Sequence, residues 1–205
     1  MHAPAAEVRA AHARLNDLIA DLTDTEVAVP SRLPGWTRGH VLAHLADAAR
    51  ARADVVAHAL RGETIPMWAP GERDAIIEAT AGRSAAEHRA VIAETSHRLD
   101  ELWAEVRDWS TGLAPAVFTR WREVWIHMVD LDLGIGPGDW TADFACHVLD
   151  VLHRRLPEGH AIRATDLDER VWGTGEETTG EVRTLAAQLA GRAPTALALG
   201  PWPTY

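Results

Sequence analysis

A carboxylate and an imidazole stand four residues apart in the stretch RWREVWIHMVDLDLG, residues 120–134, which is predicted to be helical. Glu123 and His127 then lie one turn apart on the same face of that helix. Carboxylate oxygens and imidazole nitrogens are ligands that zinc and similar divalent ions accept. The pair therefore predicts part of a metal site, and a third ligand must come from another element.

The best third ligand is a histidine in the stretch LPGWTRGHVLAHLADAAR, residues 33–50, which is predicted to begin a second helix. His44 lies deep in the apolar stripe of that helix, whereas His40 lies one turn earlier, nearer the helix start. We expect His44 to complete an open three-ligand site, and His40 is the alternative that would close a four-ligand structural site. Because the chain has 11 histidines, spacing alone does not distinguish such a site from a semi-buried hydrogen bond.

The pattern of apolar residues in the rest of the chain predicts a helical bundle that would hold these two helices together. Apolar residues recur at helical spacing in five segments, and Thr37 and the Ser84–Glu87 capping box mark two of the helix starts. In a four-helix bundle, metal sites are built from side chains that face each other across the core. The long connection at residues 62–83, with a short helix at 73–79, is of a length that is often functional. The five helices are expected at residues 5–22, 38–61, 84–106, 118–133 and 141–156.

The pattern changes after Gly159, where short alternating runs separated by Asp and Gly predict two or three strands. A short helix is expected within residues 181–192, and a final strand in the last ten residues. We therefore predict a mainly α protein, with a metal-binding helical bundle at residues 1–158 and a small α+β domain at 159–205.

Composition narrows the class of partner. The chain has 205 residues and a formal net charge of -10, which argues against nucleic acid or an anionic membrane. A small anionic molecule is still a possible ligand, because a few well-placed arginines are enough to bind it. Cys146 is the single cysteine, so no intramolecular disulfide is possible, and its apolar helical surroundings predict an inert thiol. The charged N-terminal stretch is unlike a signal peptide, and we expect a cytoplasmic protein.

Four stretches resemble the mycothiol-dependent maleylpyruvate isomerases, in that family's order from Pro34 to the C-terminus. They are LPGWTRGHVLAHLADAARA, PMWAPGERDAIIEATAGR, RWREVWIHMVDLDLG and LAAQLAGR. The family belongs to the wider DinB-like group of metal-binding bundles, so the resemblance implies a DinB-like up-and-down helical bundle followed by a small α+β C-terminal domain. It also implies His44, Glu123 and His127 as ligands of a divalent metal, with zinc the expected ion. The short C-terminal part and the run IHMVDLDLG depart from the family's usual pattern.

The same resemblance implies an activity. Arg192 matches a catalytic arginine of the C-terminal domain, Arg73 is a candidate contact for substrate or thiol, and Trp68 is expected to line the cofactor pocket. The implied reaction is cis-trans isomerisation of maleylpyruvate to fumarylpyruvate, or of a similar enoyl diacid. The thiolate of mycothiol would add to the double bond, allow rotation about it and then leave.

Two other functions fit the same scaffold, namely a mycothiol-dependent S-transferase and a non-catalytic protein that binds a small ligand. In each case the expected partners are a small molecule and a low-molecular-weight thiol or ligand, and the protein is expected to be a monomer or homodimer. Fold and metal transfer more safely from a resemblance than the substrate does.

Overall fold

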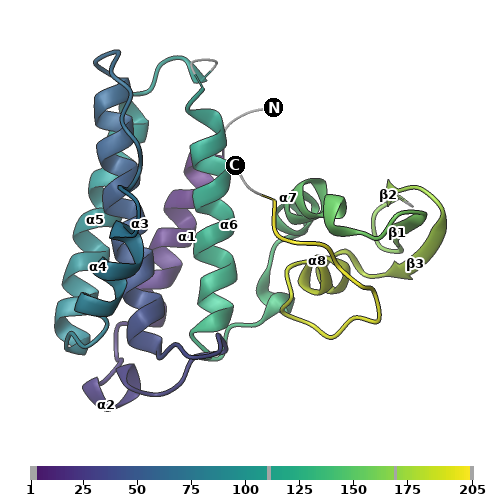
Figure 1. The fold of residues 1–205 in the computed structure, drawn as a ribbon, viewed down its shortest axis with the longest axis horizontal. Helices are drawn as coiled ribbons and strands as arrows, with labels where there is room; N and C mark the ends of the chain where they lie inside the picture. The colour runs from purple at the N-terminus through teal and green to yellow at the C-terminus, as the bar shows by residue number, and fades with distance from the viewer. Residues whose placement is uncertain (1–3, 110–111, 169, 204–205) are drawn as a thin grey trace. The chain divides into compact units, whose positions relative to one another are not determined.

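The computed structural model describes residues 4–109, 112–168 and 170–203. It confirms the mainly α architecture, with one small sheet in the C-terminal part (Figure 1). The chain divides into two compact units, Met1–Leu133 and Gly134–Tyr205. Each unit has its own core and is described separately below.

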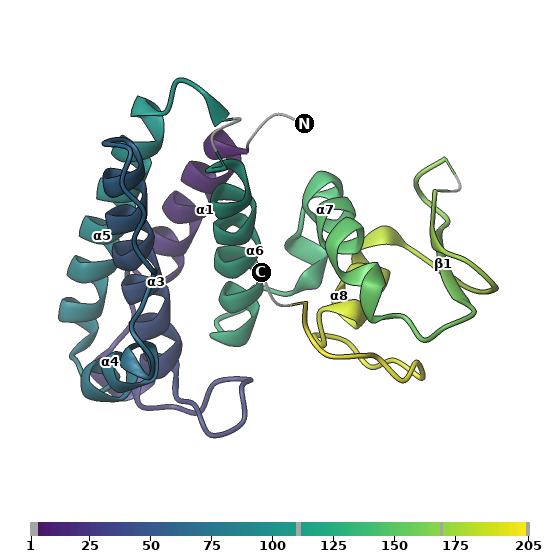
Figure 2. The ribbon, with the colours of Figure 1, turned by 45° about the horizontal axis from the view of Figure 1, so that its top comes forward.

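Four long helices form the N-terminal unit. α3 packs along α5, α5 along α1, α1 along α6 and α6 along α3, so the four helices close a bundle (Figures 1 and 2). Their apolar stripes meet in a core that includes Leu15, Leu42, Leu45, Leu99 and Val124. The helices are α1 (Ala5–Leu18), α3 (Arg38–Ala59), α5 (Ala85–Glu105) and α6 (Ala114–Asp130).

Local sequence signals set several of the helix starts. Thr37 and Ser84 cap α3 and α5 through capping boxes, as expected. α6 begins four residues before the expected start, because Pro115 occupies its first turn, where its missing N–H costs nothing. The long connection carries the expected short helix, α4 (Glu72–Thr80), and the first connector carries one that was not expected, α2 (Asp24–Val27).

The C-terminal unit packs α7 against α8 and places α8 beside a three-stranded sheet. The sheet order is β2-β1-β3, with β1 antiparallel to β2 and parallel to β3. Two short 3-10 turns, η2 (Pro137–Asp139) and η3 (His153–Arg155), flank α7. The elements are α7 (Ala142–Leu152), β1 (His160–Ala164), β2 (Val171–Gly173), β3 (Glu176–Gly180) and α8 (Val182–Leu189).

Two expectations for this region differ from the structure. The expected boundary between residues 158 and 159 falls instead after Leu133, because α7 packs on α8 and so belongs with the sheet. The expected final strand is absent from the described residues, since 194–203 have no regular structure. The proline-rich sequence there removes backbone donors that a strand would need.

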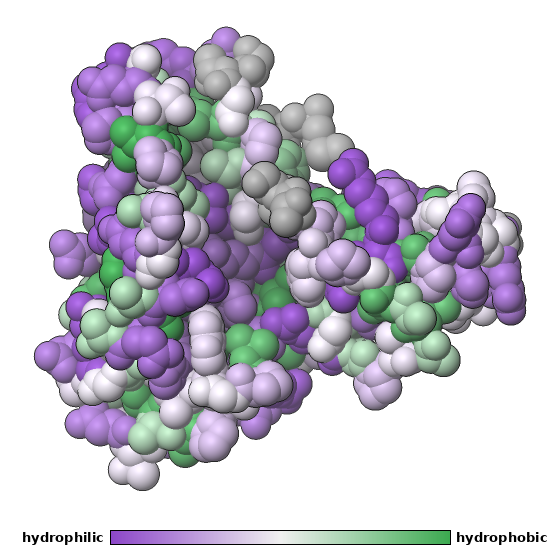
Figure 3. Space-filling model, in the orientation of Figure 1, coloured by the Kyte–Doolittle hydropathy of each residue, from purple (hydrophilic) through white to green (hydrophobic). Residues whose placement is uncertain are grey.

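The visible surface of the bundle is mostly hydrophilic, with apolar residues scattered over it (Figure 3). Among the described residues, the large apolar side chains that are exposed lie apart in the sequence, at Val29, Leu60, Val171 and Trp202. Within the same part of the chain, no helix has the length and apolar character needed to cross a membrane.

Candidate functional site

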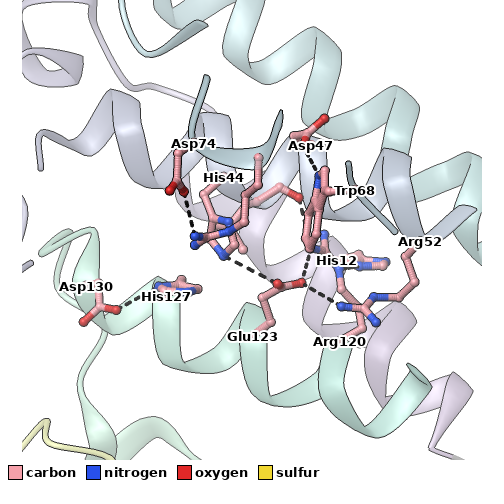
Figure 4. A network of polar contacts seen from close by, with 12 residues as sticks. His12, His44, Asp47, Arg52, Trp68, Asp74, Arg120, Glu123, His127 and Asp130 are labelled. Atoms are coloured by element: carbon pink, nitrogen blue, oxygen red, sulfur yellow. Dashed lines mark hydrogen bonds and ion pairs between the residues drawn. The ribbon is translucent and has the colours of Figure 1, made fainter. Parts of the chain in front are cut away.

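The structure brings the three candidate metal ligands together in the core of the bundle. His44 comes from α3, and Glu123 and His127 come from successive turns of α6, which packs along α3. Figure 4 shows His44 and Glu123 pointing toward each other, with His127 beside them. The side chains are 6%, 12% and 18% exposed, respectively, so the group is buried but not sealed.

The separation of His44 and Glu123 is informative. Nε2 of His44 lies 3.4 Å from Oε1 of Glu123, which is long for a hydrogen bond. Two atoms that each lie about 2.1 Å from one tetrahedral ion are themselves about 3.4 Å apart. The rings of His44 and His127 are nearly perpendicular, at 82°, with 4.8 Å between their centroids. The spacing of the first pair therefore fits two ligands of one ion.

The three side chains do not yet enclose an ion. In the ranges that the structure describes, no three His, Cys, Asp or Glu side chains form a group that could hold a metal. Nδ1 of His44 is buried and has no hydrogen-bond partner among these residues. This nitrogen diverges from Nε2, the atom that faces Glu123, so it is not the atom that would bind an ion held by that pair.

Burial and charge hold the pair in the protonation states that a metal requires. Burial is the main cause that lowers the pKa of His44, to about 3, with the charge of His127 adding to it. Burial opposes ionisation of Glu123, but the positive charges of Arg52 and Arg120 outweigh it and lower the pKa of that carboxyl to about 2. At neutral pH the site therefore presents a neutral imidazole beside an ionised carboxylate.

Asp130 orients His127. Its Oδ2 lies 2.9 Å from Nδ1 of His127, and its side chain is buried. The structure thus gives this aspartate a contact with the histidine one turn before it. A carboxylate that accepts from Nδ1–H leaves the lone pair of Nε2 for another partner.

Beneath Glu123 lies a buried polar network that the sequence did not predict. Arg120 donates to Oε2 of Glu123 (2.9 Å) and to the carbonyl oxygen of Leu45 (3.0 Å). Nη2 of Arg52 lies 3.7 Å from the same carboxylate oxygen. Arg120 stands three residues before Glu123, so helical spacing could have placed it on the same face. The contact with Arg52 crosses to α3 and has no signal in the sequence.

Arg73 and Trp68 both lie in the connection that follows α3. After burial and the charge of His127, the positive charge of Arg73 is a smaller cause that lowers the pKa of His44. Arg73 is 40% exposed and is bonded to Asp74 (3.0 Å). Trp68 is half-buried, and its indole N–H donates to Oδ2 of Asp47 on α3 (2.7 Å), as Figure 4 shows. The connection is thus fastened to the helix that carries His44.

The remaining two candidates are placed differently. Nδ1 of His40 lies 2.7 Å from the hydroxyl of Thr37 and 3.2 Å from its backbone nitrogen, so His40 serves the cap of α3 rather than the group around His44. Arg192 follows α8 in the C-terminal unit and donates to the carbonyl oxygen of Ala190 (2.7 Å). Its part in the site stays a prediction.

Comparisons with known proteins give a family for the N-terminal unit and a similar fold for the chain. The family model described as the mycothiol maleylpyruvate isomerase N-terminal domain matches residues 8–132. Two crystal structures have a similar fold, those of a mycothiol-dependent maleylpyruvate isomerase and of a histidine-to-alanine mutant of that enzyme. Each aligns with 98% of this chain and 94% of its own chain, at 21% sequence identity and a TM-score of 0.81. A comparison with curated protein sequences gave no match.

Proposed function

The chain belongs to the family of the mycothiol maleylpyruvate isomerase N-terminal domain, and from this premise we propose that it is a metal- and mycothiol-dependent cis-trans isomerase. Its substrate would be maleylpyruvate or a similar enoyl diacid. His44, Glu123 and His127 would hold one divalent ion, with zinc the expected one. A resident zinc ion would act as a Lewis acid and favour the thiolate form of the thiol cofactor.

One observation carries this proposal, namely the 3.4 Å separation between a neutral His44 and an ionised Glu123. If these groups were only structural, a direct hydrogen bond near 2.9 Å would be the favourable arrangement. Together with His127 they offer two nitrogens and one oxygen. Three such protein ligands leave a coordination position for an exogenous molecule, as catalytic zinc sites do.

The charges around the carboxylate support an anionic substrate. Arg52 and Arg120 are buried, and both act on Glu123, so two cations face one anion there. Arg73 adds a third positive charge, partly exposed, on the side of His44. Arg52 and Arg120 both act on Glu123, and Arg73 is bonded to Asp74, so these charges are partly neutralised. Arg73, the exposed one of the three, would be the arginine available to a carboxylate of an enoyl diacid or to the thiolate of the cofactor.

The other residues would position substrate and cofactor. Arg73 can offer two parallel N–H groups to a substrate carboxylate, as arginine does in bidentate pairs. Trp68, held through Asp47, would line the thiol pocket. Arg192 would stabilise negative charge that develops on the substrate. Cys146 is not needed, because burial raises the pKa of its thiol and the reactive thiol comes from the cofactor.

A turnover assay tests the proposal. Metal-loaded protein is mixed with maleylpyruvate, with and without mycothiol, and its metal content is measured after gel filtration. We expect thiol-dependent isomerisation and about one divalent ion per chain. His44→Ala should lose the ion and at least about 100-fold in activity, since even outer-shell partners of a metal contribute 10–100-fold.

The matched control is His97→Ala, which removes an exposed histidine of α5 that is 73% exposed and paired with Glu101. This variant should keep both metal and activity. If the protein binds metal and transfers the thiol to an electrophile but does not isomerise maleylpyruvate, the proposed activity would be that of an S-transferase instead. Absence of any bound divalent ion would refute the metal-dependent mechanism itself.

A further inference from the structure

Arg120 is held in place by residues of three other helices. Its guanidinium is completely buried, and its Nε donates to Nε2 of His12 on α1 (2.9 Å). Nδ1 of His12 lies 3.0 Å from Oδ1 of Asp100 on α5. The carbonyl of Leu45 on α3 accepts from Nη1 of Arg120. We call Asp100, His12 and Arg120 the buried relay, and Figure 4 shows its inner part.

The direction of each hydrogen bond in the relay is fixed by chemistry. An arginine Nε can only donate, so Nε2 of His12 must accept. The proton of the neutral imidazole then lies on Nδ1 and is donated to Asp100. Burial is the main cause that lowers the pKa of His12, which keeps this ring neutral, as the pattern requires. The relay therefore has one arrangement, and it sets the plane of the Arg120 guanidinium.

The guanidinium in turn sets the carboxylate of Glu123. Nη1 of Arg120 donates to Oε2, and Nη2 of Arg52 approaches the same oxygen at 3.7 Å. The other oxygen, Oε1, is the one that faces His44. Oε2 is thus engaged by the two arginines on the side away from His44, and Oε1 is directed at the candidate metal position.

We propose that Asp100, His12 and Arg120 are positioning residues that make Glu123 a ligand through Oε1 alone. This inference rests on the proposed function, because it assigns a role to residues behind the same metal site. Hydrogen bonds to a ligating carboxylate commonly contribute 10–100-fold to metal affinity. In His12→Leu, Nε of Arg120 loses its acceptor, and the guanidinium keeps only the bonds of Nη1 to Leu45 and Glu123. Its plane, and with it the position of Oε2, is then less closely set.

The test measures affinity for Co²⁺ by competition with a coloured chelator, together with the visible spectrum of the bound ion. His12→Leu and Asp100→Leu should weaken Co²⁺ binding by about 10–100-fold and about 3–10-fold, respectively, and change the spectrum, which reports ligand number and geometry. His12→Gln and Asp100→Asn should recover most of the affinity. A glutamine can accept from Arg120 and donate to Asp100, and an asparagine oxygen still accepts from Nδ1–H of His12.

His88→Leu is the matched control, because His88 is equally buried on α5 but is bonded to the carbonyl of Ala81 (3.3 Å), outside the relay. It should lower stability and leave both the affinity and the Co²⁺ spectrum unchanged. Unchanged binding in His12→Leu, or failure of the conservative variants to recover it, would overturn the positioning role while the metal site stood. A wild-type protein that bound no Co²⁺ would instead overturn the proposed function, and the relay's role with it.

Discussion

Replacing Gly39 by alanine should destabilise the N-terminal unit, although alanine is the better helix former. Gly39 is buried in the first turn of α3, within the stretch LPGWTRGH. A Cβ at this position would overlap the backbone carbonyl of Ala81, just after α4, and would lie 3.0 Å from Cγ1 of Val27. The glycine therefore permits the close approach of α4 to the helix that carries His44.

The two opposing effects can be compared. Glycine to alanine in a helix stabilises by up to about 1 kcal/mol, whereas forcing an extra carbon into a packed contact costs about 1–3 kcal/mol. The clash here is with a backbone oxygen, which cannot rotate away, so the upper part of that range applies. The net expectation is a loss of about 1–2 kcal/mol in unfolding free energy, or about 2–8 °C in melting temperature at 2–4 °C per kcal/mol.

Urea unfolding followed by circular dichroism measures this loss. Gly82→Ala is the matched control, because it lies one residue beyond Ala81 and a Cβ there meets no atom within 4 Å. It should be neutral, or stabilise by about 0.4–1 kcal/mol through the unfolded chain. If Gly39→Ala unfolded at the same urea concentration as the wild type, or at a higher one, the inferred contact between α3 and α4 would be wrong.

Two further predictions concern α5. Burial is the main cause that lowers the pKa of His88 below its ordinary value of 6.5, so the unfolded chain binds this proton first as pH falls. The free energy of unfolding should therefore be constant above about pH 6.5 and decrease below it. The decrease should be smaller in His88→Gln. Urea midpoints measured across this pH range test both expectations. Ser84→Ala removes the cap of α5 and should lower the unfolding free energy by about 1 kcal/mol in the same assay. Ala86→Ser, at an exposed position two residues beyond the cap, serves as control. A midpoint unchanged in Ser84→Ala would contradict the capping role.

Much of the bundle was predictable because its signals are local. Thr37 and Ser84 indicated two helix starts, because each side chain accepts a hydrogen bond from the backbone N–H three residues later. Glu123 and His127 had to share a face because of helical geometry. The position of His44 in the apolar stripe of its helix made it the best third candidate, but such a stripe does not specify which helix it packs against. The resemblance to a known family strengthened that choice. The structure then placed the three together.

The rest depended on long-range contacts. His12 and Arg120 are 108 residues apart, and His12 and Asp100 are 88 apart, so no local pattern connects them. The amphipathic sequence of α7 predicted a helix, but it did not indicate which element would cover the apolar face of that helix. In the structure this element is α8. For that reason the boundary between the units was expected about 25 residues too late. Arg192 lies beyond that boundary, and its role is still a prediction.

If the proposed metal site is correct, the buried relay has a consequence for how an ion would enter it. Its hydrogen bonds already hold Glu123, and Asp130 already holds His127. Metallation would then need the three side chains to close on the ion but no folding of the backbone, unlike sites whose ligands are ordered only by the metal. Ions could exchange while the bundle stays folded. Since two nitrogens and one oxygen suit several divalent ions, the cellular supply of metals, rather than the fold, would decide which ion the protein carries.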